Sequence, residues 1–117
     1  MNEERRADAV IAAFARLWPK CFFVAPEDRQ PLMTGIHHHL RKHLQPMIDA
    51  QRISARDIEL ALSRYTDCEA YQRKIASDAS TVRIGLLGEK RGRVIDKQRQ
   101  HAREWLSQRG QISAQAK

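Results

Sequence analysis

The 117-residue sequence has no apolar stretch approaching the roughly 18 residues that a membrane-spanning helix needs, so it predicts a protein without membrane spans. Its first eight residues include two glutamates and two arginines in place of the apolar core of a secretory signal, and we therefore expect a cytoplasmic protein. Only two cysteines are present, Cys21 and Cys68, and there is no CxxC pair. The sequence thus predicts two buried thiols and no sulfur-bound zinc.

Catalytic motifs are also missing. The sequence contains no GxSxG, no glycine-rich phosphate loop and no paired-carboxylate motif with a positioned histidine, so it predicts neither an enzyme nor a bound cofactor. One predicted helix carries four histidines: His37, His38, His39 and His43. Two of them have the i, i+4 spacing of metal ligands, but the glutamate of an HExxH site and a third ligand are missing. We expect no metal, and we interpret two of these histidines as exposed polar groups near Arg41 and Lys42 that can contact phosphate.

Basic residues outnumber acidic ones, 21 to 14, and the excess is concentrated toward the C-terminal end. Residues 1–81 carry 12 basic and 11 acidic side chains, whereas residues 82–109 carry eight basic and three acidic ones. Because positive charge gathered on one surface attracts a polyanion, the second segment is a candidate phosphate-binding surface. The hydrophobic content of 42% supports a globular fold, and the chain is long enough for one domain with a modest core.

Hydrophobic periodicity predicts a mainly helical fold. Apolar residues recur at helical spacing in residues 4–18, and Pro19 ends this helix because proline disfavours helical geometry at the preceding residue. A second helix is expected to begin around Pro31 to Thr34. Pro46 is expected to break it and to leave only a short helical turn beyond.

Polar residues mark the starts of the later helices. Ser54 and Asp57 have the spacing of a cap with an acidic residue three positions on, and Thr66 and Glu69 have the full capping-box pattern. Each cap contributes roughly 1 kcal/mol, which is enough to fix the start of a short helix. Helices are therefore expected at residues 55–65, 67–76 and 96–109.

A small β-hairpin precedes the last of these helices. Residues 81–86 alternate apolar with other side chains, and residues 93–95 can pair with them across a glycine-containing turn. Asp96 is expected to cap the last helix and Gly110 to end it, which leaves residues 111–117 as a frayed tail.

The two tyrosines have different expected roles. Tyr65 lies at an inward position of its helix and is expected in the core. Tyr71 lies in a short helix flanked by Arg64, Arg73 and Lys74, which favours an exposed ring beside cations. Such a ring could stack on an unpaired base and contribute about 1 to 3 kcal/mol. On that interpretation Tyr71→Ala weakens nucleic-acid binding and leaves the fold intact.

Several motifs occur in a set order along most of the chain. Leu-Trp-Pro-Lys-Cys-Phe at residues 17–22 is followed by Pro-Leu-Met-Thr-Gly-Ile at 31–36, Ala-Leu-Ser-Arg-Tyr-Thr at 61–66 and His-Ala-Arg at 101–103. In this order, over about residues 10–106, the sequence resembles the ProQ/FinO family of RNA chaperones.

The resemblance implies a single compact, mainly helical domain with one β-hairpin, whose concave face binds structured RNA. Members of the family favour terminator-like hairpins with a single-stranded 3′ U-rich tail. They promote pairing of antisense and target RNAs or protect 3′ ends from exonucleases. The implied partners are therefore small RNAs and mRNA 3′ ends, with no membrane partner, and we expect a monomer.

The resemblance also implies which residues bind. The RNA 3′ end is expected against a helix start at Thr34, Gly35, Ile36 and His37, with Tyr71 beside it. The chain departs from the family at Met33, Glu59, Ser63 and Thr81, where close relatives carry basic residues. The remaining candidate RNA contacts are basic side chains, some of them next to those positions: Arg41, Lys42, Arg64, Arg73, Lys74, Arg83, Arg91 and Arg93.

The expected organisation is an RNA-binding domain at residues 1–110 and a flexible tail at 111–117. Two other functions remain open from the sequence. The helices expected at 55–65 and 67–76 are joined by a tight turn and could form a helix-turn-helix of a DNA-binding regulator. Alternatively, the basic surface could bind an acidic protein partner. A metal-dependent nuclease that uses the histidines is the most remote alternative.

Overall fold

The computed structural model describes residues 2–77 and 81–116, with side chains described up to residue 109. It confirms a mainly helical domain with one antiparallel hairpin. In chain order the elements are α1 (Glu3–Leu17), the 3-10 turn η1 (Pro26–Asp28), α2 (Ile36–Asp49), α3 (Ala55–Thr66), α4 (Glu69–Ser77), β1 (Val82–Ile84), β2 (Lys90–Arg93) and α5 (Asp96–Ala116). None of the described helices is long and apolar enough to cross a membrane.

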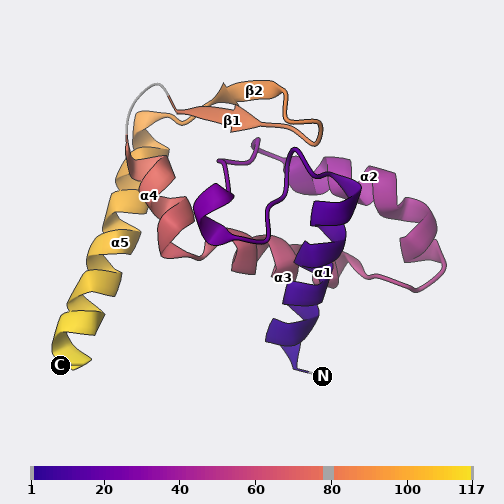
Figure 1. The fold of residues 1–117 in the computed structure, drawn as a ribbon, viewed down its shortest axis with the longest axis horizontal. Coiled ribbons are helices and arrows are strands. Elements are labelled where there is room, and N and C mark those ends of the chain that lie inside the picture. The colour runs from indigo at the N-terminus through magenta and orange to yellow at the C-terminus, as the bar shows by residue number, and fades with distance from the viewer. Residues whose placement is uncertain (1, 78–80, 117) are drawn as a thin grey trace.

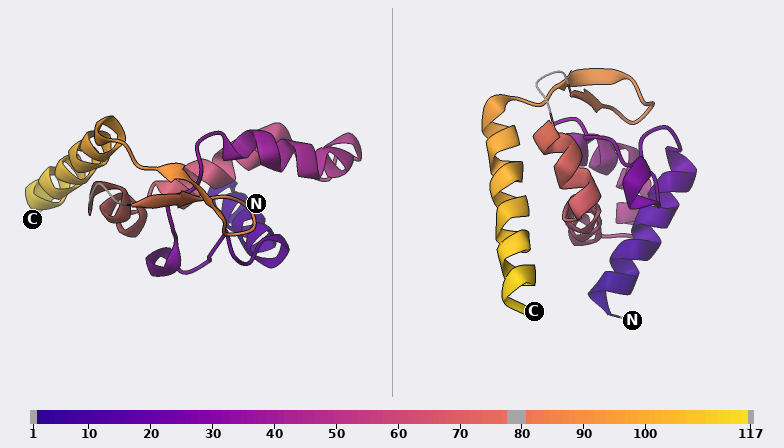
Figure 2. Two further views of the ribbon diagram at one scale, coloured as in Figure 1. Left: turned by 90° about the horizontal axis from the view of Figure 1, so that it is seen from above. Right: turned by 60° about the vertical axis from the view of Figure 1, so that its left-hand side comes forward.

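The helices form two groups, which are connected where α3 leads into α4 (Figure 1). One group consists of α1 and α2, which both pack against α3, and the other is the pair α4 and α5. The hairpin crosses above both groups, so that its turn lies near the end of α1 and its open end leads into α5. Seen from above, α2 and α5 extend in opposite directions from the centre (Figure 2).

The core is built from the apolar stripes of the helices and from the loop that follows α1. Its largest fully buried side chains include Phe14, Phe22, Leu40, Ile58 and Tyr65. Burial of such a side chain contributes about 1.5 to 3 kcal/mol. The Tyr65 hydroxyl accepts a hydrogen bond from the Phe23 N–H at 2.9 Å, so the expected core role of this tyrosine is confirmed.

A buried arginine holds the loop between α1 and α2. The guanidinium of Arg29 donates to the carbonyl oxygens of Phe23, Val24 and Tyr65, each at 3.0 Å. Its Cζ also lies 4.3 Å from the centre of the Tyr65 ring. The cation is thus satisfied by backbone carbonyls and an aromatic face, which ties the loop to the end of α3.

One of the two expected capping boxes is confirmed. The Ser54 hydroxyl accepts from the Asp57 N–H at 3.0 Å, and the Asp57 carboxylate accepts from the Ser54 N–H at 2.9 Å. The prediction of a capping box at Thr66 is wrong. Thr66 is the last residue of α3, and its hydroxyl donates to the Leu62 carbonyl at 3.1 Å. A threonine hydroxyl can bond back to its own helix as readily as it caps the next one.

Two expected helix ends are also wrong. Helix α2 continues through Pro46 to Asp49. The proline lies near the C-terminal end and removes only one N–H donor. The following turn still closes, because the Ala50 N–H donates to the Pro46 carbonyl at 3.0 Å. Helix α5 continues through Gly110 to Ala116. A glycine costs only about 1 kcal/mol relative to alanine in a helix interior, which does not stop a long helix by itself. The division into a domain and a flexible tail stays a prediction.

Smaller differences concern the start of α5 and the cysteines. Asp96 is the first residue of α5, and the preceding Ile95 occupies the cap position, where its N–H donates to the Gln98 side chain at 3.1 Å. Both cysteines are free. Cys21 is fully buried, which raises the pKa of its thiol to about 12, whereas Cys68 is only half-buried.

Candidate RNA interface

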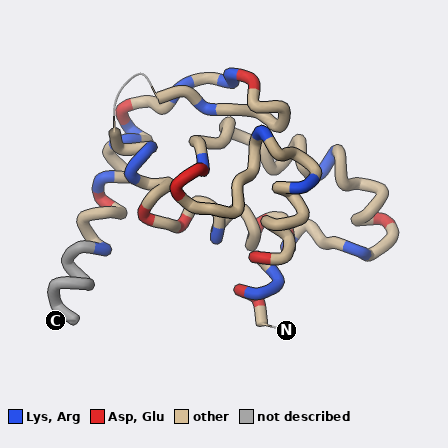
Figure 3. Tube along the Cα trace, viewed as in Figure 1, with Lys and Arg blue, Asp and Glu red and all other residues tan. Residues whose placement is uncertain are grey.

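A cavity of about 470 Å³ opens between α4, β1 and the first turns of α5. Its floor is apolar and includes Ile75 and Ala102. The polar side chains around it are Tyr71, Gln72, Arg83, Lys97, Gln98 and His101. The basic groups surround this cavity at the open end of the hairpin and along α5, where Figure 3 shows Lys and Arg positions close together.

The structure corrects the expected exposure of Tyr71. Its ring is only 5% exposed and belongs to the core, where it contacts Tyr65 at a centroid distance of 6.2 Å. Its hydroxyl accepts a hydrogen bond from the Leu32 N–H at 3.0 Å, and burial raises its pKa. Because the Tyr71 ring is buried and its hydroxyl is bonded to the loop before α2, little of the ring is available for stacking on a base.

Arg83 connects three segments at the cavity wall. It donates to the Leu32 carbonyl at 2.6 Å and to the Gln98 side-chain oxygen at 2.9 Å. The same Gln98 oxygen accepts from the backbone at the start of α5. The Nε of Arg83 is buried and has no hydrogen-bond partner among the described residues. Arg83 therefore fixes the loop before α2 against the start of α5.

The start of α2 lies close to Tyr71 and Arg83. Both of these side chains bond to the backbone of Leu32, three residues before Gly35, and three residues span at most about 10 Å. Gly35 adopts a positive φ of 78° at the cap position, and no described side chain caps the helix. Two of the first N–H groups have partners, because those of Ile36 and His38 donate to the carbonyls of Met33 and Gly35 at 3.3 and 3.0 Å. The positive end of the helix dipole still favours an anion there.

Most of the other predicted cations have intramolecular partners. Four of them do so: Arg41 with Glu59 at 3.2 Å, Arg64 with Asp8 at 2.6 Å, Arg73 with Glu69 at 2.7 Å, and Lys74 with the carbonyl oxygens of Glu27 and Arg29. Arg64 lies at a different cavity, between α1 and α3, and is not brought to Tyr71. Lys42, Arg91 and Arg93 are exposed, with Arg91 4.0 Å from Glu89.

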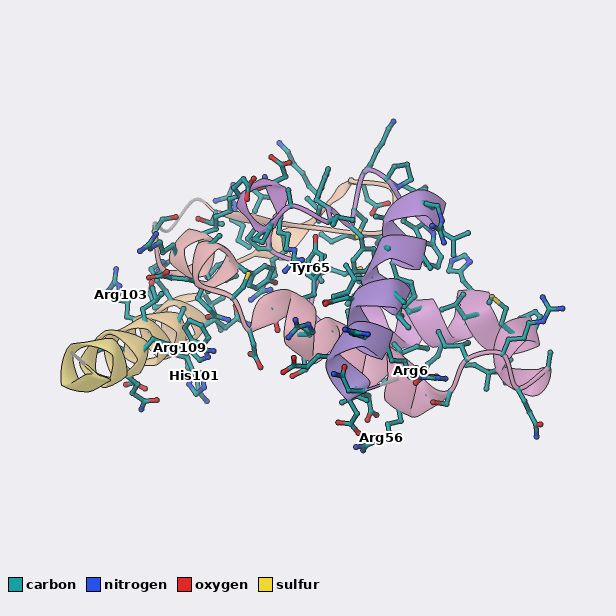
Figure 4. All side chains as sticks on the ribbon, turned by 60° about the horizontal axis from the view of Figure 1, so that its bottom comes forward. Arg6, Arg56, Tyr65, His101, Arg103 and Arg109 are labelled. Carbon is teal, nitrogen blue, oxygen red and sulfur yellow. The ribbon has the colours of Figure 1, made fainter. Side chains whose placement is uncertain are left out.

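Among the cavity residues that sequence reasoning missed, two carry a basic or imidazole side chain. Lys97 and His101 are four residues apart on α5, so they project from one face of the helix into the cavity. His101 and Arg103 project from opposite sides of α5 (Figure 4). The i, i+4 spacing within the basic segment was the available signal.

The histidines of α2 do not form a metal site with other ligands. Within residues 2–77 and 81–109, no group of three or more His, Cys, Asp or Glu side chains is placed to hold a metal ion. His37 and His38 stack with a centroid distance of 3.9 Å, and His43 contacts the Trp18 ring edge-on at 6.0 Å.

Comparison with known proteins identifies a matching family. The sequence profile of the ProQ/FINO family matches residues 5–117. The chain belongs to the ProQ/FinO family. Its sequence is 29% identical over 110 residues to the RNA chaperone ProQ of Shewanella baltica. The alignment covers 94% of this chain and 49% of that protein. The present ProQ/FinO chain thus spans about half the length of this curated relative.

Solved structures share the ProQ/FinO fold. The solution structure of a ProQ homologue from Legionella pneumophila superposes with a TM-score of 0.74 at 24% identity, covering 88% of this chain and 82% of that one. The FinO-like RNA chaperone of Neisseria meningitidis superposes with a TM-score of 0.61 at 21% identity, covering all of this chain and 88% of that one. The fold and family expected from the motif order are confirmed.

Proposed function

We propose that this ProQ/FinO chain is an RNA chaperone that binds a terminator-like hairpin and its single-stranded 3′ tail. The observation that carries the proposal is the cationic cavity beside the uncapped start of α2, where Arg83, Lys97 and His101 surround an apolar floor. Its volume lies within the range of small-molecule sites and accommodates one unpaired nucleotide. Membership of the family and the similarity to a ProQ RNA chaperone support this assignment.

The geometry divides recognition between the stem and the tail. A protein reads an A-form stem through shape and phosphates, because the deep major groove of A-form RNA is closed to side chains. The exposed Arg91 and Arg93 on β2 follow the stem phosphates. The tail enters the cavity, where Lys97 and His101 contact its phosphates and the α2 start receives the terminal hydroxyl or phosphate.

Tyr71 acts in this proposal as a positioning residue. Its hydroxyl accepts the Leu32 N–H, and this bond holds the loop that leads into α2. Tyr71 therefore positions the loop before α2 and does not itself contact the RNA. Pairing of antisense RNAs with their targets and protection of 3′ ends follow as the proposed cellular roles, carried out by a monomer in the cytoplasm.

The direct test compares one hairpin RNA with and without its U-tail. Loss of the tail is expected to weaken binding by about tenfold or more, since each hydrogen bond between a charged side chain and a tail phosphate contributes about 1.5 to 3 kcal/mol. Equal affinity for the two RNAs contradicts the tail mechanism. Duplex DNA of the same length serves as competitor and is expected to compete weakly.

A pair of α5 variants locates the tail. Lys97→Ala removes a cavity cation, whereas Arg103→Ala removes a cation from the opposite side of the same helix. The first is expected to weaken binding of the tailed hairpin and the second to leave tail discrimination unchanged. Equal effects of the two variants contradict the assignment of the cavity to the tail.

A further inference from the structure

A second cavity, of about 370 Å³, lies at the other end of the hairpin. It is formed where the hairpin turn meets the C-terminal end of α1, and its six lining residues are Leu17, Trp18, Pro19, Lys20, Leu86 and Leu87. We call these six residues the tip groove. The tip groove shares no lining residue with the cavity between α4 and α5, and the length of the hairpin separates the two (Figure 1).

Two large apolar side chains of the tip groove are exposed. Leu87 is 73% exposed and Leu17 is 55% exposed, while the neighbouring Leu86 is buried and anchors the turn in the core. A soluble domain exposes adjoining large apolar side chains at a cost in free energy, and such patches mark interaction sites. Leu17 at the end of α1 and Leu87 in the hairpin turn are therefore available to contact an apolar side chain of a partner.

The tip groove is also rigid. Gly88 has a positive φ of 79°, and a β-carbon at this position would lie 3.0 Å from the Lys20 Cβ, so only glycine lets the turn approach the chain after α1 so closely. The turn is closed by hydrogen bonds from the Gly88 N–H to the Gly85 carbonyl at 3.0 Å and from the Gly85 N–H to the Glu89 carbonyl at 2.9 Å. A preformed groove binds its partner without first ordering a loop.

The charge around the tip groove selects the partner. Lys20 is the only charged side chain among the six lining residues, and it is exposed. The nearest carboxylate of the hairpin, that of Glu89, is partly buried over Gly85 and faces Arg91 at 4.0 Å. The free charge beside the apolar surface is therefore positive.

We propose that the tip groove binds an acidic peptide segment of a partner protein, in which one or two leucine-sized side chains lie between carboxylates. The apolar side chains insert between Leu17 and Leu87, and a carboxylate pairs with Lys20. An acidic amphipathic segment satisfies both features of the groove, because its leucines match the apolar lining and its carboxylates match Lys20. Because the tip groove lies away from the cavity at α5, the partner and RNA bind together.

The test uses a fluorescent dodecapeptide with two adjacent leucines flanked by glutamates. We expect saturable binding to the full chain, with NMR amide shifts at Leu17, Lys20 and Leu87 and none at Lys97 or His101. Leu87→Ser is expected to weaken binding about tenfold or more. Val24→Ser is the matched control, because Val24 is 60% exposed and does not line the groove.

A charge exchange tests the role of Lys20. Lys20→Glu is expected to lose the acidic peptide and to bind the version in which lysines replace the glutamates. Lys20→Glu and Leu87→Ser both change exposed side chains, so circular dichroism should show an unchanged fold for each. The proposal is overturned if neither peptide binds, if Leu87→Ser and Val24→Ser behave alike, if hairpin RNA displaces the peptide, or if the tip groove instead mediates self-association or binding to anionic phospholipid vesicles.

Discussion

At the scale of single residues, buried polar side chains rather than exposed ones organise the binding side of this molecule. Arg29 and Tyr71 both lie within the core and both bond to the backbone of the segment between α1 and α2. That segment has little regular structure of its own, since η1 is only three residues long. Its shape therefore depends on a few side chains that come from α3, α4 and the segment itself.

Arg29 provides a test of that dependence. Arg29→Met keeps much of the side-chain volume but leaves three carbonyl oxygens without their donor, and each buried unsatisfied group costs about 1 to 3 kcal/mol. The free energy of unfolding in urea is expected to fall by about 3 kcal/mol or more. Arg56→Met is the control, because Arg56 forms an exposed ion pair with Glu3 and should change stability by less than about 1 kcal/mol. Similar losses for the two variants would show that the buried contacts of Arg29 add nothing.

Tyr71 separates positioning from packing. Tyr71→Phe removes only the hydroxyl that accepts the Leu32 N–H, and we expect a folded protein that is about 1 kcal/mol less stable and binds the tailed hairpin more weakly. Tyr71→Ala creates a core cavity and is expected to cost about 3 to 5 kcal/mol, so its loss of binding reports unfolding. Thermal unfolding and RNA binding measured on both variants distinguish the two effects. Full RNA affinity in Tyr71→Phe would remove the positioning role.

At the scale of elements, an ion pair joins α1 to the start of α3. Arg6 donates to both carboxylate oxygens of Asp57, at 2.6 and 2.8 Å, while the same carboxylate completes the capping box with Ser54. Figure 4 shows Arg6 and Arg56 at this contact. The hydrogen bond from Arg6 holds the pKa of Asp57 well below its usual range, with further help from Ser54 and against the effect of burial.

The lowered pKa of Asp57 predicts how stability depends on pH. Because the folded-state pKa lies below the unfolded value of about 3.9, the stabilisation is complete above that value and is lost as the pH falls toward the folded-state pKa. Asp57→Asn should therefore be less stable than the wild type by about 2 kcal/mol at pH 7. This difference should shrink below about pH 4 in urea unfolding. A difference that stays constant into strong acid would contradict the assigned titration.

The elements also show which structure could be predicted from the sequence. Apolar periodicity identified α1 and α3, and the glycine-containing alternating segment identified the hairpin, because those signals depend on local geometry and burial of one face. Thr66 and Gly110 misled because each residue type is compatible both with a helix interior and with a helix boundary, and the local sequence does not decide between them. The burial of Tyr71 could not be predicted, since it depends on Leu32, 39 residues away. The cavity that gathers Arg83 with α5 depends on the same long-range packing.

Pro46 shows how much helix propensity yields to context. It lies inside α2, where a proline costs about 3 kcal/mol relative to alanine in an interior position and less near the end. Pro46→Ala restores one backbone donor at an exposed site and is expected to raise the free energy of unfolding by about 1 kcal/mol, after the greater entropy of the unfolded chain is included. Chemical denaturation measures the gain. A loss of stability would mean that the proline contributes a native contact.

At the scale of the whole molecule, the net charge of +7 overstates the cations available to RNA. Arg64 and Arg73 are paired with carboxylates, whereas Arg91 and Arg93 on β2 are exposed, with Arg93 opposite Val82 at the open end of the hairpin. At Arg64 and Arg73, an RNA phosphate must compete with the paired carboxylate. At Arg91 and Arg93 it competes with water, and at Arg91 also with Glu89, which lies at 4.0 Å. The salt dependence of binding therefore depends on a subset of the basic residues.

This distribution of partners predicts unequal effects of charge removal. The slope of log K against log salt falls by about 0.7 to 0.9 for each phosphate contact that is lost. The double variant Arg91→Ser with Arg93→Ser should therefore reduce the slope by more than one unit, while Arg64→Ser with Arg73→Ser should change it little, although both remove the same formal charge. Binding of the tailed hairpin is measured over a series of salt concentrations. Equal reductions in the two double variants would show that RNA responds to total charge, and the hairpin would then lose its place in the interface.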